Sequence, residues 1–139
     1  MSQQPESQFD FWIGEWDVMW GEDGTGTNRI ERILDGKIIQ EDFNAPDLHG
    51  MSVSSYDPER GLWCQTWVDN NGTYLDFTGR FEDGKMVLVR DAIVKRQACK
   101  QRMVWHNIEV GQFDWNWERS DDGGTSWRVL WEIKYTRKK

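Results

Sequence analysis

The stretch "IERILDGKIIQED", residues 30–42, has the form of a β-hairpin. Asp35 and Gly36 at its centre supply the positive φ angles that a two-residue hairpin turn requires. A turn at this place fixes the register of the two strands, with Ile30 opposite Glu41 on one face of the sheet. The stretch therefore predicts an antiparallel strand pair and directs the side chain of Glu41 toward an apolar face.

Turn-forming residues recur along the whole chain. A second Asp-Gly pair at residues 83–84 predicts another hairpin, with Phe81 opposite Met86 and Gly79 opposite Leu88. With further Gly-, Pro- and Asn-containing segments, the turns recur about every 12 residues, which is the strand-plus-turn spacing of an all-β protein. One interval is twice as long, and a turn near residues 97–100 would divide it. The spacing predicts about ten antiparallel strands in one domain, residues 1–139, with helix confined to a short turn near residues 7–13.

Most of these strands alternate bulky apolar side chains with polar ones, as in "FDWNWER" (113–119) and "VLWEIKYTR" (129–137). Such alternation gives each strand one apolar face. The inward set that it predicts comprises Trp63, Gln65, Trp67, Leu75, Phe77, Gly79, Phe81, Phe113, Trp115, Trp117, Val129, Trp131, Ile133, Tyr135 and Arg137. No long amphipathic helix is available to cover these faces. The sequence therefore predicts an up-and-down antiparallel closed β-barrel, because closure buries the apolar faces and removes exposed edges.

Composition argues against several classes of function. The net charge of -7 and a pI near 4.8 would repel a phosphate backbone, so nucleic acid is not an expected partner. The first residues lack the basic and apolar regions of a secretory signal, and no run of about 18 apolar residues occurs that could span a membrane. We therefore expect a cytoplasmic protein with no membrane partner.

Metal and cofactor sites are not expected either. Cys64 and Cys99 stand alone, without the spacing of a zinc site, and are expected to be free thiols. His49 and His106 are the only histidines. A single histidine could ligate haem, but His106 falls on an outward face by alternation and His49 falls in a loop. Haem binding is therefore the least favoured hypothesis.

The N-terminal segment "FDFWIGEWDV", residues 9–18, contains Gly14-x-Trp16 at the start of the first predicted strand. This pair is similar to the Gly-x-Trp signature of the calycins, which include lipocalins and fatty-acid-binding proteins. Together with "ERILDGKIIQED", "GLWCQTWVDNNG", "GKMVL" and "ERSDDGGTSW", the segment resembles a bacterial lipocalin-like β-barrel family of unknown function. The resemblance runs from Phe9 to Arg137. It implies a barrel that encloses a cavity, a helical turn that closes one end, and an Arg137 side chain that covers Trp16, but it implies no reaction.

The octapeptide "SDDGGTSW", residues 120–127, fits the spacing of an Asp-box, and so resembles the hairpin motif of sialidase propellers. A chain of 139 residues is too short for several four-stranded blades, and glycoside hydrolysis needs two carboxylates placed across a sugar. We interpret Ser120, Asp122, Gly124 and Trp127 as structural residues. In this interpretation Asp122 accepts backbone N–H groups of its own turn, glycine allows positive φ, and Trp127 packs over the loop.

Glu41 is the main candidate for a functional side chain. The predicted register places it on the inward face, diagonal to Arg32 on the neighbouring strand. A carboxylate inside a barrel is costly unless it is paired, hydrogen-bonded or reached by water. Either Arg32 and Glu41 form a structural ion pair, or Glu41 takes part in ligand recognition. Gln65, between Trp63 and Trp67, is the second polar group expected on an aromatic inner face.

These patterns predict a protein that binds a small apolar or aromatic molecule in a barrel cavity. Trp63, Trp67, Trp105, Trp117 and Trp131 would enclose the ligand. Glu41, Gln65 and Arg32 would orient its polar end. The alternative is a cofactor-independent isomerase, cyclase or hydrolase on the same scaffold, with Glu41 as general acid or base. Both hypotheses are compatible with a homodimer.

Overall fold

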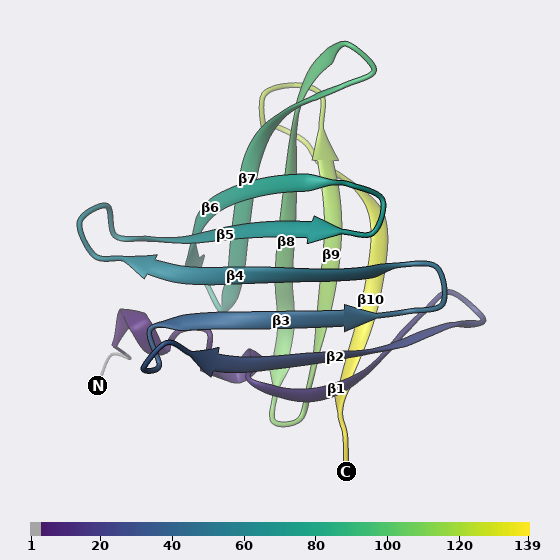
Figure 1. The fold of residues 1–139 in the computed structure, drawn as a ribbon. Helices are drawn as coiled ribbons and strands as arrows, with labels where there is room; N and C mark the ends of the chain where they lie inside the picture. The colour runs from purple at the N-terminus through teal and green to yellow at the C-terminus, as the bar shows by residue number, and fades with distance from the viewer. Residues whose placement is uncertain (1–3) are drawn as a thin grey trace.

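Ten antiparallel strands form a closed barrel in the computed structural model, which describes residues 4–139 (Figure 1). Each strand pairs with its neighbours in sequence, and the first strand pairs with the last. The strands are β1 (Gly14–Trp20), β2 (Gly24–Ile33), β3 (Ile38–Asn44), β4 (His49–Asp57), β5 (Leu62–Asp69), β6 (Tyr74–Glu82), β7 (Lys85–Val94), β8 (Gln97–Glu109), β9 (Gln112–Ser120) and β10 (Arg128–Arg137). Two short 3₁₀ turns, η1 (Pro5–Ser7) and η2 (Asp10–Trp12), precede β1. The predicted up-and-down barrel with an N-terminal helical turn is confirmed.

The register of both Asp-Gly hairpins is confirmed as well. Ile30 lies opposite Glu41 between β2 and β3, and Phe81 lies opposite Met86 between β6 and β7. Asp35 and Asp83 have φ angles of 61° and 54°, and each is followed by a glycine whose φ is also positive. The turn chemistry of these pairs therefore sets which side chains of four strands face the barrel interior.

Two local predictions are wrong. The turn expected near residues 97–100 lies earlier, at Lys95 and Arg96, where two non-glycine residues adopt φ angles of 50° and 68°. A bulge in β10 changes the alternation before Trp131, so Val129 pairs with Glu118 and is 51% exposed instead of facing inward. The ion pair between Arg32 and Glu41, one of the two alternatives for Glu41, does not form within residues 4–139.

The helical turns close one end of the barrel, which we call the helical end. Phe9 and Trp12 are almost fully buried there, and the ring of Phe9 lies 5.0 Å from the rings of both Trp63 and Trp105. Arg32 reaches across to this segment instead of to Glu41, donating to the Glu6 carbonyl at 3.0 Å and to the Asp10 carboxylate at 2.5 Å. The barrel interior at this end is therefore packed with side chains.

The first and last strands join at Trp16 and Arg137, as the resemblance to calycins implies. Trp16 lies opposite Arg137 in the register of β1 and β10, and the Arg137 Cζ atom lies 4.4 Å from the centroid of the indole ring. Arg137 Nη1 also donates to the Ile13 carbonyl at 2.9 Å. Gly14 leaves room for the guanidinium, since a Cβ atom there would lie 2.1 Å from Nη1. The Gly-x-Trp pair thus forms one side of the barrel closure.

The Asp-box octapeptide forms the turn between β9 and β10. The Asp122 carboxylate accepts the Ser126 backbone N–H at 2.9 Å, and Ser120 Oγ accepts the Gly124 N–H at 2.8 Å. Trp127 Nε1 donates to the Gly124 carbonyl at 3.1 Å, and the Arg102 guanidinium lies 4.0 Å from the Trp127 ring centroid. These contacts explain the octapeptide as a structural motif that forms and stabilises the turn between β9 and β10.

Candidate functional site

A cavity of about 260 Å³ lies inside the barrel. Its wall comes from β3, β5, β6, β8, β9 and β10 and from the loops that follow β3 and β5. The bordering residues are Glu41, Phe43, Leu48, Trp67, Asp69, Thr73, Leu75, Phe77, Met103, Trp105, Trp115, Trp117, Trp131, Ile133 and Tyr135. Aromatic rings dominate this wall, and only a few polar groups reach it, which is the usual composition of a small-molecule site.

Trp105 separates the cavity from the packed helical end. Its ring borders the cavity and also lies 5.0 Å from Phe9 and 5.3 Å from Trp12. Because Phe9 and Trp12 fill the space next to it, the cavity extends toward the opposite end of the barrel, where Leu48 and Thr73 follow β3 and β5. Trp105 is thus the floor of the site.

The rings around the cavity meet edge to face. Trp115 and Trp131 are perpendicular, with centroids 5.7 Å apart, and Phe43 lies 6.2 Å from Trp131 at 83°. Phe77 and Trp117 make a similar contact at 5.9 Å and 79°. This is a favoured geometry for aromatic pairs, and it holds neighbouring rings as walls at right angles to one another.

Trp67 is held in place by two local features of β4 and β5. Gly50 on β4 lies under the indole, and a Cβ atom at Gly50 would lie 2.2 Å from Trp67 Cζ2. The Nε1–H group of Trp67 donates to the Asp69 carboxylate at 2.8 Å. The Trp67 indole is therefore fixed as one wall of the cavity, because Gly50 leaves room for it and Asp69 accepts its hydrogen bond.

Glu41 is the buried carboxyl group of the site, with 7% of its surface exposed. Its Oε2 atom accepts from Asn28 Nδ2 at 2.7 Å, and its Oε1 atom accepts from Ser52 Oγ at 2.7 Å. Asn28 Nδ2 also donates to the Tyr135 hydroxyl at 2.9 Å. The carboxyl group of Glu41 is thus linked through an amide to a phenol that also borders the cavity.

Burial raises the pKa of Glu41 above its ordinary value, and the negative charge of Asp42 adds to this. Hydrogen bonds from Ser52 and Asn28 lower the pKa without cancelling the effect of burial. Burial also raises the pKa of Tyr135, with a further contribution from the charge of Glu41, so the phenol stays protonated. A carboxyl group in this setting is chemically able to hydrogen-bond a ligand or to exchange a proton with it.

Asp69 is the second acidic group on the wall. Burial alone would raise its pKa, but hydrogen bonds from Trp67 and from the backbone of Asn71 and Thr73 outweigh that effect, and the net pKa is lowered. Asp69 therefore carries a negative charge at neutral pH. It forms the turn after β5 and also borders the cavity.

The structure brings together five of the eight ligand-site residues that the sequence predicts. Glu41, Trp67, Trp105, Trp117 and Trp131 all border the cavity. The other three lie elsewhere. Trp63 packs at the helical end against Phe9 and Tyr56, Gln65 is buried with its Nε2 donating to Ser54 Oγ at 2.9 Å, and Arg32 binds the helical segment.

Sequence reasoning missed the partners that surround Glu41. Asn28 and Ser52 both lie on polar stretches that suggest a solvent-facing surface. The hairpin register contains the signal that could have identified Asn28, because it lies two residues before Ile30 and opposite Phe43, on the same inward face. Ser52 lies directly opposite Glu41 on β4.

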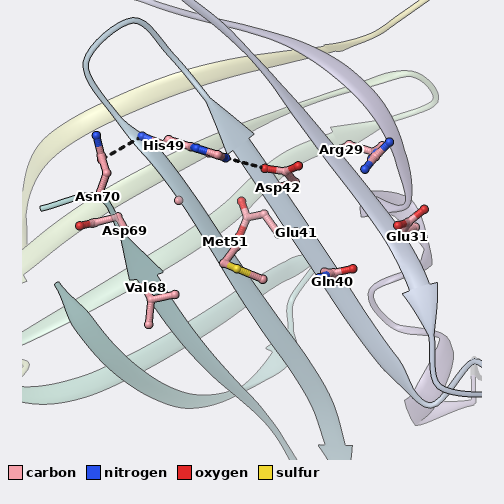
Figure 2. A pocket seen from close by; sticks show the side chains of 11 residues that line it. Arg29, Glu31, Gln40, Glu41, Asp42, His49, Met51, Val68, Asp69 and Asn70 are labelled. Atoms are coloured by element: carbon pink, nitrogen blue, oxygen red, sulfur yellow. Dashed lines mark hydrogen bonds and ion pairs between the residues drawn. The ribbon is translucent and has the colours of Figure 1, made fainter. Parts of the chain in front are cut away.

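A second, larger pocket of about 490 Å³ lies on the outer surface of β2 to β5 (Figure 2). Its labelled side chains are mainly polar, including Arg29, Asp42 and Asn70. His49 is engaged here, with Nε2 at 3.1 Å from Asp42 Oδ1 and its backbone N–H donating to Asn70 at 3.0 Å. No Phe, Tyr or Trp is among the described residues that line this pocket, whereas such rings form most of the inner wall, so the inner cavity is the stronger candidate site.

The remaining metal- and cofactor-type residues lie away from the cavity. His106 contacts Asn116 at 3.0 Å, on the outward face of the β8 and β9 pair, and Cys64 and Cys99 are free thiols. Within residues 4–139, no group of three or more His, Cys, Asp or Glu side chains is arranged to hold a metal ion. Over the same residues, no helix has the length and apolar character that crossing a membrane requires.

No protein-family model matches this chain, and no curated protein matches it either. The closed ten-stranded antiparallel barrel agrees with a calycin-type fold. Membership of the bacterial lipocalin-like family stays a prediction from the sequence motifs.

Proposed function

We propose that the protein binds a small, largely apolar molecule, such as one with an aromatic ring, in the barrel cavity. The observation that carries this proposal is a void of about 260 Å³ bordered by indole and phenyl rings and by the buried carboxyl group of Glu41. Ligand sites usually combine an apolar wall with a few placed polar groups in this way. The volume lies just below the usual range for drug-sized ligands, so it favours a ligand with one or two rings.

A pair of matched variants tests this proposal. Leu75 borders the cavity, whereas Tyr74 beside it is 67% exposed on the outer face. Leu75→Trp adds ring volume inside the cavity, and Tyr74→Trp makes a comparable exchange outside it. Isothermal titration with 2-phenylethanol should detect binding to the wild type and to Tyr74→Trp, and none to Leu75→Trp. Equal binding to both variants would refute the proposal.

A second candidate function is favoured by the network around Glu41. A buried carboxyl group with a raised pKa, linked through Asn28 to Tyr135, is suited to proton transfer. The protein would then be a cofactor-independent isomerase, cyclase or hydrolase with Glu41 as general acid or base. Screening of small aromatic metabolites should reveal a turnover that Glu41→Gln abolishes while binding persists. Binding without turnover across the screen would favour the carrier function.

A further inference from the structure

The cavity wall contains two acidic side chains and no positive one. Glu41 and Asp69 are its acidic residues, and none of the residues from 4–139 that border the cavity is Lys, Arg or His. A buried anionic ligand would therefore meet two acidic groups and no counter-charge, which is strongly unfavourable. The net charge of the whole chain, -7, also attracts cations to the protein and repels anions.

The groups that hydrogen-bond the Glu41 carboxylate are neutral. Its two hydrogen bonds come from the amide of Asn28 and the hydroxyl of Ser52, and the nearby charge that acts on it is that of Asp42, which is also negative. A carboxylate can accept about four hydrogen bonds. The two donors therefore leave acceptor capacity on both oxygens, and a buried carboxylate is stabilised when a cation supplies the missing charge.

Asp69 is the second acidic group and lies nearer the loop after β5. In the register of the sheet, Asp69 lies opposite Gly50, whereas Trp67 lies opposite Ser52 in the same row as Glu41. The two acids are thus one row apart on the inward face of β3 to β5, with Trp67 beside both. The bonds from Trp67 Nε1 and from the backbone of Asn71 and Thr73 hold the Asp69 carboxylate in place.

The aromatic rings of the cavity wall attract cations, an attraction that a purely aliphatic wall would lack. Trp is the side chain whose face attracts cations most strongly, and Trp67, Trp115, Trp117 and Trp131 all border the cavity. Several indole rings combined with carboxylates form the kind of site that recognises organic ammonium groups.

We propose that the natural ligand is a small organic cation, an aromatic or alkyl amine whose protonated nitrogen lies beside Glu41 and Asp69 while its apolar part lies among the indole rings. This inference rests on the proposed binding function and specifies the charge of the ligand. It excludes fatty acids and other carboxylates as ligands of this cavity.

Three probes of similar size but different charge test the inference. They are 2-phenylethylamine, which is cationic at neutral pH, 2-phenylethanol, which is neutral, and phenylacetate, which is anionic. Isothermal titration should give an affinity for the amine at least about tenfold above that for the alcohol, since ring and carboxylate attractions act together, and no binding of phenylacetate. Glu41→Gln should lower the affinity for the amine about tenfold and leave that for the alcohol unchanged.

Glu132→Gln is the matched control, because it makes the same exchange at an exposed side chain on the outer face of β10, next to Trp131. It should leave the affinity for the amine close to that of the wild type. Thermal unfolding confirms that each variant is folded, and Asp69→Asn provides the same test should Glu41→Gln fail to fold.

The outcomes separate the two proposals. Equal affinity for amine and alcohol, tighter binding of phenylacetate, or an equal loss of amine affinity in Glu41→Gln and Glu132→Gln would overturn the cation inference and leave the cavity as a binding site. Absence of binding by all three probes, or equal binding to wild type and Leu75→Trp, would overturn both.

Discussion

Replacement of Arg137 by alanine should destabilise the barrel by about 2 kcal/mol, through two losses of known size. The guanidinium lies 4.4 Å from the Trp16 ring centroid and is exposed to solvent, so the cation–π contact contributes about 0.5–1 kcal/mol. The 2.9 Å bond from Nη1 to the Ile13 carbonyl contributes about 1 kcal/mol more. Uncovering Trp16, now 1% exposed, adds a smaller hydrophobic term.

Urea unfolding followed by tryptophan fluorescence measures this change as a shift of midpoint at constant slope. Arg137→Lys should recover less than half of the loss, because an ammonium lacks the planar surface that stacks on the indole. Lys138→Ala is the control, since it removes only an exposed ion pair with Asp17, at 2.8 Å, and such pairs contribute about 0–1 kcal/mol. A stability of Arg137→Ala equal to that of Lys138→Ala would refute the role of Arg137 in closing the barrel.

Three further changes have defined outcomes. Gly50→Ala places a methyl group 2.2 Å from Trp67 Cζ2, so it should push the indole into the cavity and lower the stability of the fold by about 1–3 kcal/mol. Titration calorimetry should then show weaker binding of 2-phenylethanol, and unchanged binding would contradict this. Glu41→Gln should be increasingly more stable than the wild type as pH rises above the ordinary carboxyl value of 4.5. A pKa that is raised in the folded state stabilises the wild type at low pH, and this stability is lost as the pH rises and Glu41 ionises. If urea unfolding showed the same difference in stability between Glu41→Gln and the wild type at every pH, Glu41 would not be a buried carboxyl group. Asp122→Ala should lower the thermal midpoint more than Asp121→Ala, because the Asp122 carboxylate accepts several hydrogen bonds from its own turn. It should leave the affinity for the probes unchanged, and a loss of affinity would show that the motif belongs to the binding site.

The fold follows from the sequence to the extent that turns and alternation are local properties. An Asp-Gly pair fixes a hairpin register, and that register alone placed Glu41 inside. The bulge in β10 could not be predicted, because one extra residue in a strand leaves no mark in the alternation of "VLWEIKYTR" until the partner strand is known. The two-residue turn at Lys95 and Arg96 could not be located from the sequence for a related reason, since neither residue is a usual turn former.

The site could be predicted only in part, because alternation gives the face of a side chain but not its depth along the barrel. Trp63 and Trp67 share one face of β5, yet Phe9 from the helical segment packs against Trp63 whereas Trp67 borders the cavity. The same limit applies to Arg32, which is drawn to Asp10 and the Glu6 carbonyl by a segment whose position depends on the tertiary fold. Strand pattern therefore identifies the candidate wall, and the helical segment decides which part of it stays free.

A crystal structure of the protein with bound 2-phenylethylamine tests the central claim most directly. We expect the phenyl ring to lie among Trp67, Trp115 and Trp131, with the ammonium nitrogen within hydrogen-bond distance of the Glu41 carboxylate. A probe bound instead in the outer pocket beside Asp42 and His49, with the inner cavity unoccupied, would contradict it.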